Sequence, residues 1–243
     1  LAKRLLEKGS ELAGVDNLNN FYDPQLKKDR LEQLINHPNF KFTKIDFTDQ
    51  DKTRFFFKKQ PFEQVIHLGA QAGVRYSLEN PQAYIDANLT GFLNILEGCR
   101  QHNIRNVIYA SSSSVYGGNI KSPFSENDRV EQPLSLYGAS KIANEAMAHA
   151  YAHLYNIQMI GLRFFTVYGP WGRPDMALFK FTRNILSGEP IPVYNRGQMV
   201  RDFTYIDDVV EGVIRVIDKP PNATVASEGI ATVAPWRIYN IGN

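Results

Sequence analysis

Short apolar runs alternate with amphipathic helical segments along the first two thirds of the chain, and this alternation constrains the fold more than any other feature. Parallel strands joined by helical crossovers form a sheet that helices cover on both faces. The functional site of such an α/β fold lies at the carboxyl ends of its strands. The predicted strands are 11–16, 40–46, 62–70, 107–111 and 159–165, and the predicted helices are 1–8, 24–35, 84–100 and 136–155.

The regular alternation ends near Gly169. Beyond it, prolines and glycines interrupt the chain and the apolar periodicity weakens. We therefore predict a main domain over residues 1–168 and a smaller, partial substrate-binding lobe over 169–243, whose last segment returns to the main domain. Residues 218–235 are predicted to be a loop or a flexible insertion.

Composition excludes several classes of function. The net charge is +2 and the basic residues are scattered, which argues against a nucleic-acid partner. The one cysteine, Cys99, cannot form an internal disulfide and fits a reducing compartment, so we expect a cytoplasmic protein. No apolar run approaches the roughly 18 residues of a membrane span, and no signal peptide is visible, so no membrane contact is expected. His149 and His153 have metal-ligand spacing but no third ligand, so no metal is expected.

Acidic residues close two successive predicted strands. In a Rossmann-like, doubly wound fold, an acid about 20 residues past a glycine-rich turn binds the ribose 2′-hydroxyl of a dinucleotide. Asp16 has this position if the turn precedes Leu1, so we expect a chain truncated at both ends, lacking its first strand and glycine turn. A carboxylate there favours NAD, because it would repel the 2′-phosphate of NADP. A turn-forming Asp16-Asn17 pair explains the same residues equally well.

Tyr137 and Lys141 lie four residues apart in a predicted helix and therefore share one helix face. A serine run, 111–114, ends the preceding strand. A phenol titrates near pH 10, and lowering its pKa by about 3 units takes about 4 kcal/mol, part of which a neighbouring ammonium supplies. This combination suits removing a proton from an alcohol while a hydride leaves the same carbon. The bare pair also fits a helix with a packed tyrosine and a solvated lysine.

Longer motifs accompany this pair. They are DNLN at 16–19, HLGAQAGVRYS at 67–77, SSSSVYG at 111–117, YGASK at 137–141, LRFFTVYGPWGRPD at 162–175 and RDFTYIDD at 201–208. Through them, almost the whole chain resembles the extended short-chain dehydrogenase/reductase family, and within it the UDP-glucuronate 4-epimerases.

The resemblance implies a role for individual residues. Tyr137 would be the catalytic base, Lys141 its electrostatic partner and a ligand of the nicotinamide ribose, and Ser112 a hydrogen-bonding partner of the reacting sugar oxygen. It also implies bound NAD, a UDP-sugar substrate and a homodimer. The expected cofactor-binding residues are Asp16, Asn17, Asn20, Asp46, Leu68, Ala70, Asn88 and Lys141. The expected substrate-binding residues are Ser113, Ser114, Thr166, Arg173, Val193 and Arg201.

The serine run discriminates among related reactions. A dehydratase needs an acid and a base beside the sugar, where this chain has Ser113 and Ser114. A decarboxylating relative carries a glutamate in the serine loop instead. Neutral hydroxyls together with Arg173 suit holding a uronate carboxylate in place. We therefore expect an NAD-dependent isomerase that interconverts UDP-glucuronate and UDP-galacturonate through a transient 4-ketone. A UDP-hexose 4-epimerase, a UDP-glucuronate decarboxylase and a non-catalytic NAD-binding scaffold or regulator are the alternatives.

Overall fold

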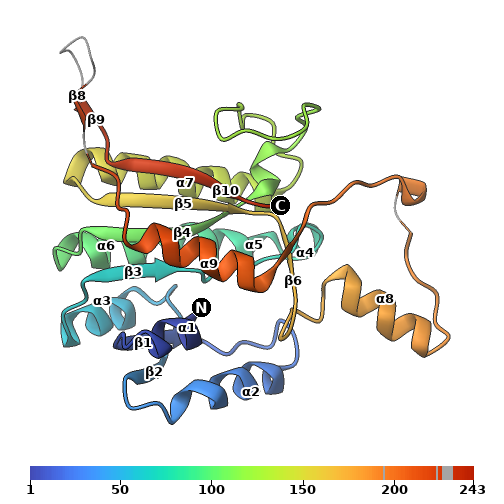
Figure 1. The fold of residues 1–243 in the computed structure, drawn as a ribbon, viewed down its shortest axis with the longest axis horizontal. Coiled ribbons are helices and arrows are strands. Elements are labelled where there is room, and N and C mark those ends of the chain that lie inside the picture. The colour runs from blue at the N-terminus through green and yellow to red at the C-terminus, as the bar shows by residue number, and fades with distance from the viewer. Residues whose placement is uncertain (194, 223, 226–231) are drawn as a thin grey trace.

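A parallel sheet with strand order β10-β5-β4-β3 forms the centre of the molecule, and a parallel pair β1-β2 lies beside β3 (Figure 1). The computed structural model describes residues 1–193, 195–222, 224–225 and 232–243. The predicted α/β class with a doubly wound parallel sheet is confirmed. The strands of the two sheets are β1 (Leu12–Asp16), β2 (Phe40–Lys44), β3 (Gln64–His67), β4 (Asn106–Ser112), β5 (Gln158–Phe164) and β10 (Trp236–Ile241).

Helices connect these strands, and local capping signals fix the ends of two of them where the sequence predicted. α2 begins after Asp23, whose carboxylate accepts a hydrogen bond from the Gln25 amide at 2.8 Å. α7 begins after Ser135, whose hydroxyl accepts from the Gly138 amide at 3.0 Å, and it ends at Asn156, which has a left-handed conformation. The helices are α1 (Ala2–Glu7), α2 (Pro24–Ile35), α3 (Gln50–Lys59), α4 (Tyr76–Glu79), α5 (Pro81–Tyr84), α6 (Phe92–Gln101), α7 (Leu136–Tyr155), α8 (Ala177–Leu186) and α9 (Ile206–Ile217).

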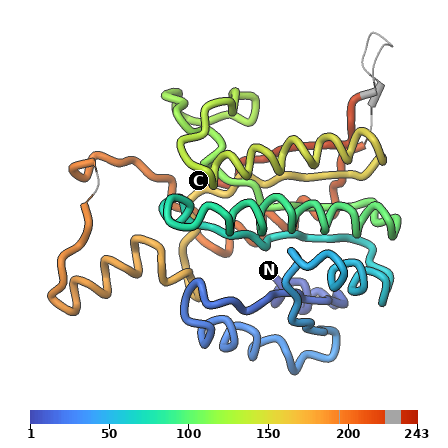
Figure 2. Tube along the Cα trace, turned by 180° about the vertical axis from the view of Figure 1, so that it is seen from behind, coloured from blue at the N-terminus to red at the C-terminus, as the bar shows by residue number. Residues whose placement is uncertain are grey.

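Apolar side chains leave both faces of the sheet, because successive residues of a strand point to opposite sides. On one face, Val107, Tyr109 and Met159 pack in a cluster with side chains of α3, α6 and α7. Figure 2 shows α6 and α7 lying over this face. On the other face, Ile108 and Ile160 pack near α9. The central strands are therefore buried on both sides, as a parallel sheet requires.

Three predicted elements differ from those observed. The predicted strand 62–70 is only β3, because its ladder with β4 ends at His67 and the following residues form a loop. The predicted strand 40–46 ends at Lys44, which leaves Asp46 on a loop. The predicted helix 84–100 starts at Pro81 and contains a π-helix, Ile85–Gly91, before α6.

The chain leaves the central sheet after β5 and forms β6 (Thr166–Tyr168), which pairs in parallel with β7 (Phe203–Tyr205) in a separate two-stranded sheet. Between them, α8 stands apart from the layers in both views and buries none of its residues (Figures 1 and 2). The division into domains 1–168 and 169–243 stays a prediction. Within the predicted loop 218–235, β8 (Thr224–Val225) and β9 (Thr232–Val233) form an antiparallel pair, and the rest of it includes residues outside the described ranges. No helix among the described residues is long and apolar enough to cross a membrane.

Candidate active site

The first turn of α7 lies against the short 3-10 helix Ser113–Tyr116 that follows β4. Gly138 permits this approach, because a Cβ at that position would lie 2.8 Å from the backbone oxygen of Ser114. The Ser112 hydroxyl accepts a hydrogen bond from the Ser114 amide at 3.2 Å, and Ser112 lies close enough to Tyr137 to lower the pKa of its phenol. The structure thus brings Ser112 and Tyr137 together at the carboxyl end of β4.

Lys141 lies one turn further along α7, and its side chain is buried. Its ammonium donates a hydrogen bond to the Ala110 carbonyl at 2.8 Å, and Ala110 is its one hydrogen-bond partner within the described ranges. Burial lowers the pKa of Lys141 to about 8. An ammonium has three donors, so this group keeps two N–H bonds for a polar ligand. A buried donor with unused capacity is consistent with a site for the hydroxyls of a ribose.

The pKa of Tyr137 is raised, because burial outweighs two effects that lower it. These are the nearby Ser112 side chain and the positive charge of Arg173. The phenol is therefore protonated in the chain by itself, and further positive charge is needed before it acts as a base. Among the described residues, Arg173 is the cation whose charge lowers the pKa of Tyr137. The expectation that Lys141 lowers the Tyr137 pKa stays a prediction.

A buried ion pair behind these residues is the main feature that the sequence analysis missed. The Arg163 guanidinium donates to both Glu145 oxygens at 2.9 and 2.8 Å, and Ser111 donates to the same carboxylate at 2.5 Å. Arg163 also donates to the Tyr116 hydroxyl at 2.9 Å. Glu145 follows Lys141 by one helical turn, so the pair fixes α7 against β4 and β5. The signal was a carboxylate on the same helix face as Tyr137 and Lys141, four residues beyond the lysine.

The expected acidic residues meet at the ends of β1 and β2. The Asn17 side-chain amide donates to Asp46 at 2.9 Å, and the Leu18 amide donates to Asp16 at 2.6 Å. Partial burial tends to raise the pKa of Asp46, but hydrogen bonds from Asn17 and Thr48 outweigh it and lower this pKa. Both carboxylates are exposed and offer acceptor oxygens, which suits the hydroxyls and the amino group of an adenosine.

The loop that follows β3 lies next to these carboxylates. Phe47 packs against it, and a Cβ on Gly69 would lie 2.8 Å from the Phe47 ring. Leu68 is exposed and Ala70 is partly exposed on the same loop. The exposed Leu68, the carboxylate acceptors of Asp16 and Asp46, and the unused donors of Lys141 fit a dinucleotide, so the residues present are suited to hold NAD.

Asn88 lies in the π-helix and uses its side chain within the protein. Its amide oxygen accepts from the Gln71 amide at 2.8 Å, and its amide nitrogen donates to the Gln71 carbonyl at 3.0 Å and to Ser140 at 2.9 Å. Asn144 donates to the Asn88 carbonyl at 2.6 Å. Asn88 therefore ties the loop after β3 to α7, whereas Asn20 is exposed on the loop after β1.

Two of the expected substrate-binding residues, Ser113 and Ser114, lie in the short helix that packs on the turn of α7 that carries Tyr137. The hydroxyls of Ser113 and Ser114 bond to no protein group within the described part of the chain, which leaves both available to a ligand. Arg173 forms a two-pronged pair with Asp175. Thr166 begins β6, and its amide donates to the Asp202 carbonyl at 3.1 Å.

Val193 and Arg201 are not brought to Tyr137 by any described contact. Val193 is exposed, and the Arg201 guanidinium donates to the carbonyl of its own neighbour, Val200, at 2.9 Å. Tyr194, which the sequence places beside Val193, lies outside the described residues. The roles of these two substrate-side residues stay predictions.

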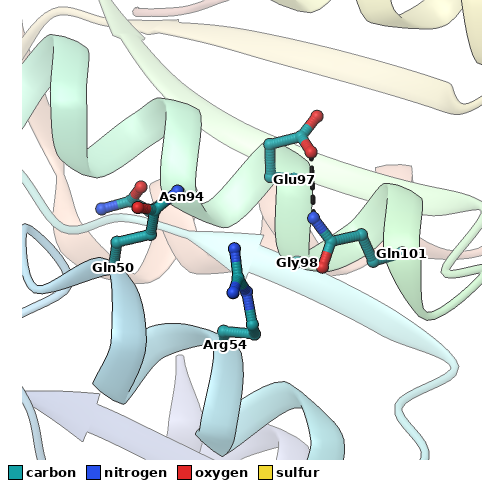
Figure 3. Close-up of a pocket in the computed structure, with 6 residues that line it drawn as sticks. All are labelled: Gln50, Arg54, Asn94, Glu97, Gly98 and Gln101. Atoms are coloured by element: carbon teal, nitrogen blue, oxygen red, sulfur yellow. Dashed lines mark hydrogen bonds between the residues drawn. The ribbon is translucent and has the colours of Figure 1, made fainter.

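A separate small pocket lies between α3 and α6 (Figure 3), and none of the expected site residues lines it. Its polar side chains are largely engaged within the fold. Glu97 accepts from Gln101 at 3.0 Å, as the dashed line in Figure 3 shows, and also from Arg100 at 2.8 Å. Asn94 donates to the Phe47 carbonyl at 2.9 Å. The pocket is therefore linked to the expected cofactor site only indirectly, because its residue Asn94 anchors the loop that carries Asp46.

The two histidines with metal-ligand spacing lie on α7. His149 packs its ring edge-on against Trp236 at 5.3 Å between ring centres. Across the described ranges, no group of three histidine, cysteine or acidic residues is arranged to hold a metal ion.

Comparison with known proteins gives a consistent result. Residues 1–242 match the NAD dependent epimerase/dehydratase family. The chain is 53% identical to Protein CapI of Staphylococcus aureus, over 100% of this chain and 74% of that protein. It is 49% identical to UDP-glucuronate 4-epimerase 1 of Arabidopsis thaliana, over 98% of this chain and 56% of the plant protein. The crystal structure of UDP-glucuronic acid 4-epimerase from Bacillus cereus, in complex with UDP-glucuronic acid and NAD, superimposes with a TM-score of 0.86 at 30% identity, covering 100% of this chain and 73% of that chain.

Proposed function

The chain belongs to the NAD dependent epimerase/dehydratase family, and we propose that it catalyses the NAD-dependent 4-epimerisation of UDP-glucuronate to UDP-galacturonate. One observation carries this choice of reaction. Ser113 and Ser114 follow Ser112 in the short helix that packs on the first turn of α7, the charge of Arg173 lowers the pKa of Tyr137, and no carboxylate stands in the serine run 111–114. The same geometry supports the reverse reaction, because an isomerase returns to its starting state after each turnover.

Tyr137 and Ser112 act on the C4 hydroxyl of the sugar. The Tyr137 phenolate accepts the hydroxyl proton, and Ser112 holds the reacting oxygen by a hydrogen bond. Bound NAD would supply a reversible hydride acceptor for C4, so that the ketone could be reduced again on its other face. Tyr137 then returns its proton to the oxygen, so no second substrate is consumed. Lys141 offers its unused donors to the cofactor ribose, and Asp16 and Asp46 offer acceptors to the adenosine.

The carboxylate of the sugar must be restrained while C4 is a ketone. A β-keto acid loses CO₂ when its carboxylate rotates out of the ketone plane. Hydroxyls of Ser113 and Ser114 and the Arg173 guanidinium can bond both carboxylate oxygens and block this rotation. This clamp separates the proposed epimerase from a decarboxylase with the same first half-reaction.

We also infer a homodimer that acts in the cytoplasm. α6 and α7 pack against each other and each exposes a leucine, Leu93 near the start of α6 and Leu154 near the end of α7, which supports contact with a second copy along these two helices. Cys99 is buried with its pKa raised to about 12 by that burial, which supports a structural thiol in a reducing compartment. Sedimentation equilibrium and subcellular fractionation test these two inferences.

The deciding experiment follows UDP-glucuronate by proton NMR in the presence of NAD. The purified chain should produce UDP-galacturonate signals, and Tyr137→Phe should lower the rate by about 10²- to 10⁴-fold because the proton acceptor is lost. Tyr151→Phe is the matched control, since Tyr151 lies on the same helix but donates to Glu97 at 2.7 Å. Absence of C4 inversion, or a Tyr137→Phe enzyme that runs at full rate, contradicts the proposed reaction.

The same assay tests the clamp through its products. Replacing Ser113 and Ser114 together with alanine should raise the share of UDP-pentose, because the carboxylate is less restrained. A ratio of pentose to uronate that matches the wild-type ratio rejects the clamp and leaves the epimerisation itself standing.

A further inference from the structure

Arg30 joins two segments that are far apart in the sequence. It lies on α2, and its guanidinium donates to the Trp171 carbonyl at 2.6 Å and to the Gly172 carbonyl at 3.2 Å. The same guanidinium donates to the Tyr22 hydroxyl at 2.6 Å. Its Nε is buried without a hydrogen-bond partner, a cost that an arginine with a purely solvated head would not incur.

The turn that Arg30 holds has an unusual backbone. Trp171 has a φ of 63°, which is rare for a residue with a side chain, and Gly169 has a φ of 137°. The Trp171 side chain is 50% exposed, so packing of the indole does not explain the conformation. Strained backbone conformations of this kind persist only where surrounding contacts hold the chain in place. The Arg30 hydrogen bonds supply contacts of this kind at the two carbonyls of the turn.

The next residue of the turn is Arg173, and it meets the loop that Arg30 also touches. The Arg173 guanidinium lies 6.0 Å from the centre of the Phe21 ring. Arg30 contacts Tyr22, the neighbour of Phe21, and lies 5.5 Å from the centre of the Tyr22 ring. The two arginines thus contact adjacent aromatic residues of the loop that follows β1. The same loop contains the expected cofactor residues Asn17 and Asn20.

We propose that Arg30 is a positioning residue, which holds the turn 169–173 against the loop after β1 and thereby sets the place of Arg173 beside Tyr137. The proposal rests on the proposed function for its kinetic consequence, since Arg173 is there a ligand of the sugar carboxylate. Its structural content is independent of substrate. Without the two hydrogen bonds from Arg30 to the Trp171 and Gly172 carbonyls, the turn 169–173 is released, and Arg173 moves away from the Tyr137 phenol.

The test compares Arg30→Gln with a matched arginine variant. Arg105 also donates to a backbone carbonyl, that of Tyr155 at 2.7 Å, but it lies outside the site, so Arg105→Gln controls for the general loss of such a bond. Arg30→Gln should raise the KM for UDP-glucuronate about tenfold, the equivalent of one charged hydrogen bond, with a smaller change in kcat. Arg30→Lys keeps the charge but cannot bond to both carbonyls in the same way, so its KM for UDP-glucuronate should lie between the values of wild type and Arg30→Gln.

The second readout is the titration of Tyr137, followed by NMR of protein with ¹³C-labelled tyrosine and assigned with Tyr137→Phe. The groups that face the phenol are Ser112, Arg173, Tyr84 and, one turn along α7, Lys141. Only Arg173 moves in the proposal, so Arg30→Gln should raise the pKa of Tyr137, whereas Arg105→Gln should leave it unchanged. In the double variant with Arg173→Gln, the Arg30→Gln exchange should cause no further shift.

The outcomes separate the positioning role from the proposed reaction. If Arg30→Gln matches Arg105→Gln in both KM and Tyr137 titration, Arg30 only stabilises the fold and the positioning role is wrong. If the wild-type chain does not turn over UDP-glucuronate, the proposed function is wrong, and the titration still decides whether Arg30 places Arg173. An additive double variant also overturns the proposal, because it means that the two arginines act separately on Tyr137.

Discussion

Two arginine–carboxylate pairs have the same two-pronged geometry but opposite surroundings. Arg163 and Glu145 have side chains that are 4% and 6% exposed and join β5 to α7. Arg173 and Asp175 are 31% and 25% exposed and lie two residues apart in one turn. A buried pair that loses one partner leaves an uncompensated charge, whereas a solvent-reached pair exchanges partners at little cost. The first pair is suited to fix positions, and the second is suited to give up its carboxylate to a ligand.

The segments around the two pairs also differ in how firmly they are held in the fold. Around Arg163, hydrogen bonds run through Tyr116 to Asn240 of β10, whose side chain accepts from the phenol at 2.6 Å. Around Arg173, the chain departs from the sheet, and α8 buries none of its residues. Segments with few buried contacts open at lower free energy than the core does. We therefore expect a rigid reacting side and an adjustable substrate side, with Arg30 as the fixed point between them.

Removing one charge of the buried pair is the largest test of this contrast. Glu145→Gln should lower the free energy of unfolding by about 3–5 kcal/mol, because the Arg163 cation stays buried without its anion. Asp175→Asn should change it by about 1 kcal/mol or less, as for an exposed pair. Urea denaturation of both variants measures the two values directly.

A double replacement controls for the chemistry of the buried pair. Glu145→Leu combined with Arg163→Met removes both charges and should be more stable than either single variant. Equal destabilisation by Glu145→Gln and Asp175→Asn would remove the distinction between the two pairs.

Lys141 provides the second test of this contrast, because burying its ammonium on the rigid side lowers the free energy of unfolding. Its pKa is lowered to about 8 from 10.5, so the folded state loses the proton first as the pH rises. The unfolded state then binds more protons, and wild-type stability should rise with pH between about 8 and 10.5. Below pH 8, Lys141→Met should gain about 3 kcal/mol from the removed burial cost and lose about 1 kcal/mol with the Ala110 hydrogen bond. A net stabilisation of about 2 kcal/mol at pH 7, together with loss of activity, is the expected result.

Thermal and urea unfolding at pH 7 and pH 10 check this sign. Lys58→Met, at an exposed position on α3, is the control and should show neither the gain at pH 7 nor its decrease at pH 10. A Lys141→Met protein that is less stable than wild type at pH 7 would mean that the ammonium is well compensated inside the fold.

The same contrast explains how far the sequence predicted the molecule. α2 and α7 have the predicted bounds, and the structure shows that Asp23, Ser135 and Asn156 cap them through contacts within a few residues. The π-helix Ile85–Gly91 has no comparable signal, since it depends on how Asn88 bonds to a loop and to α7. Contacts that cross the chain, such as Arg30 to Trp171, follow from the fold and not from spacing. The sequence therefore predicted Tyr137, Lys141 and Ser112 as site residues, which stay predictions, but it gave no indication of the residues that hold them in place.

The smallest expected effect belongs to Asp175, and its direction is informative. If Asp175 competes with a substrate carboxylate for Arg173, then Asp175→Asn should lower the KM for UDP-glucuronate by up to about fivefold, the equivalent of an exposed ion pair. The kcat should change little, because the Tyr137 and Ser112 side chains are untouched. A neutral UDP-hexose has no carboxylate to exchange, so its KM should stay constant. Glu211→Gln, which breaks the exposed pair with Arg215 on α9, is the control for a change of surface charge. A KM that rises in Asp175→Asn would show instead that Asp175 holds Arg173 in its binding position, and the exposed pair would then share the fixing role of the buried one.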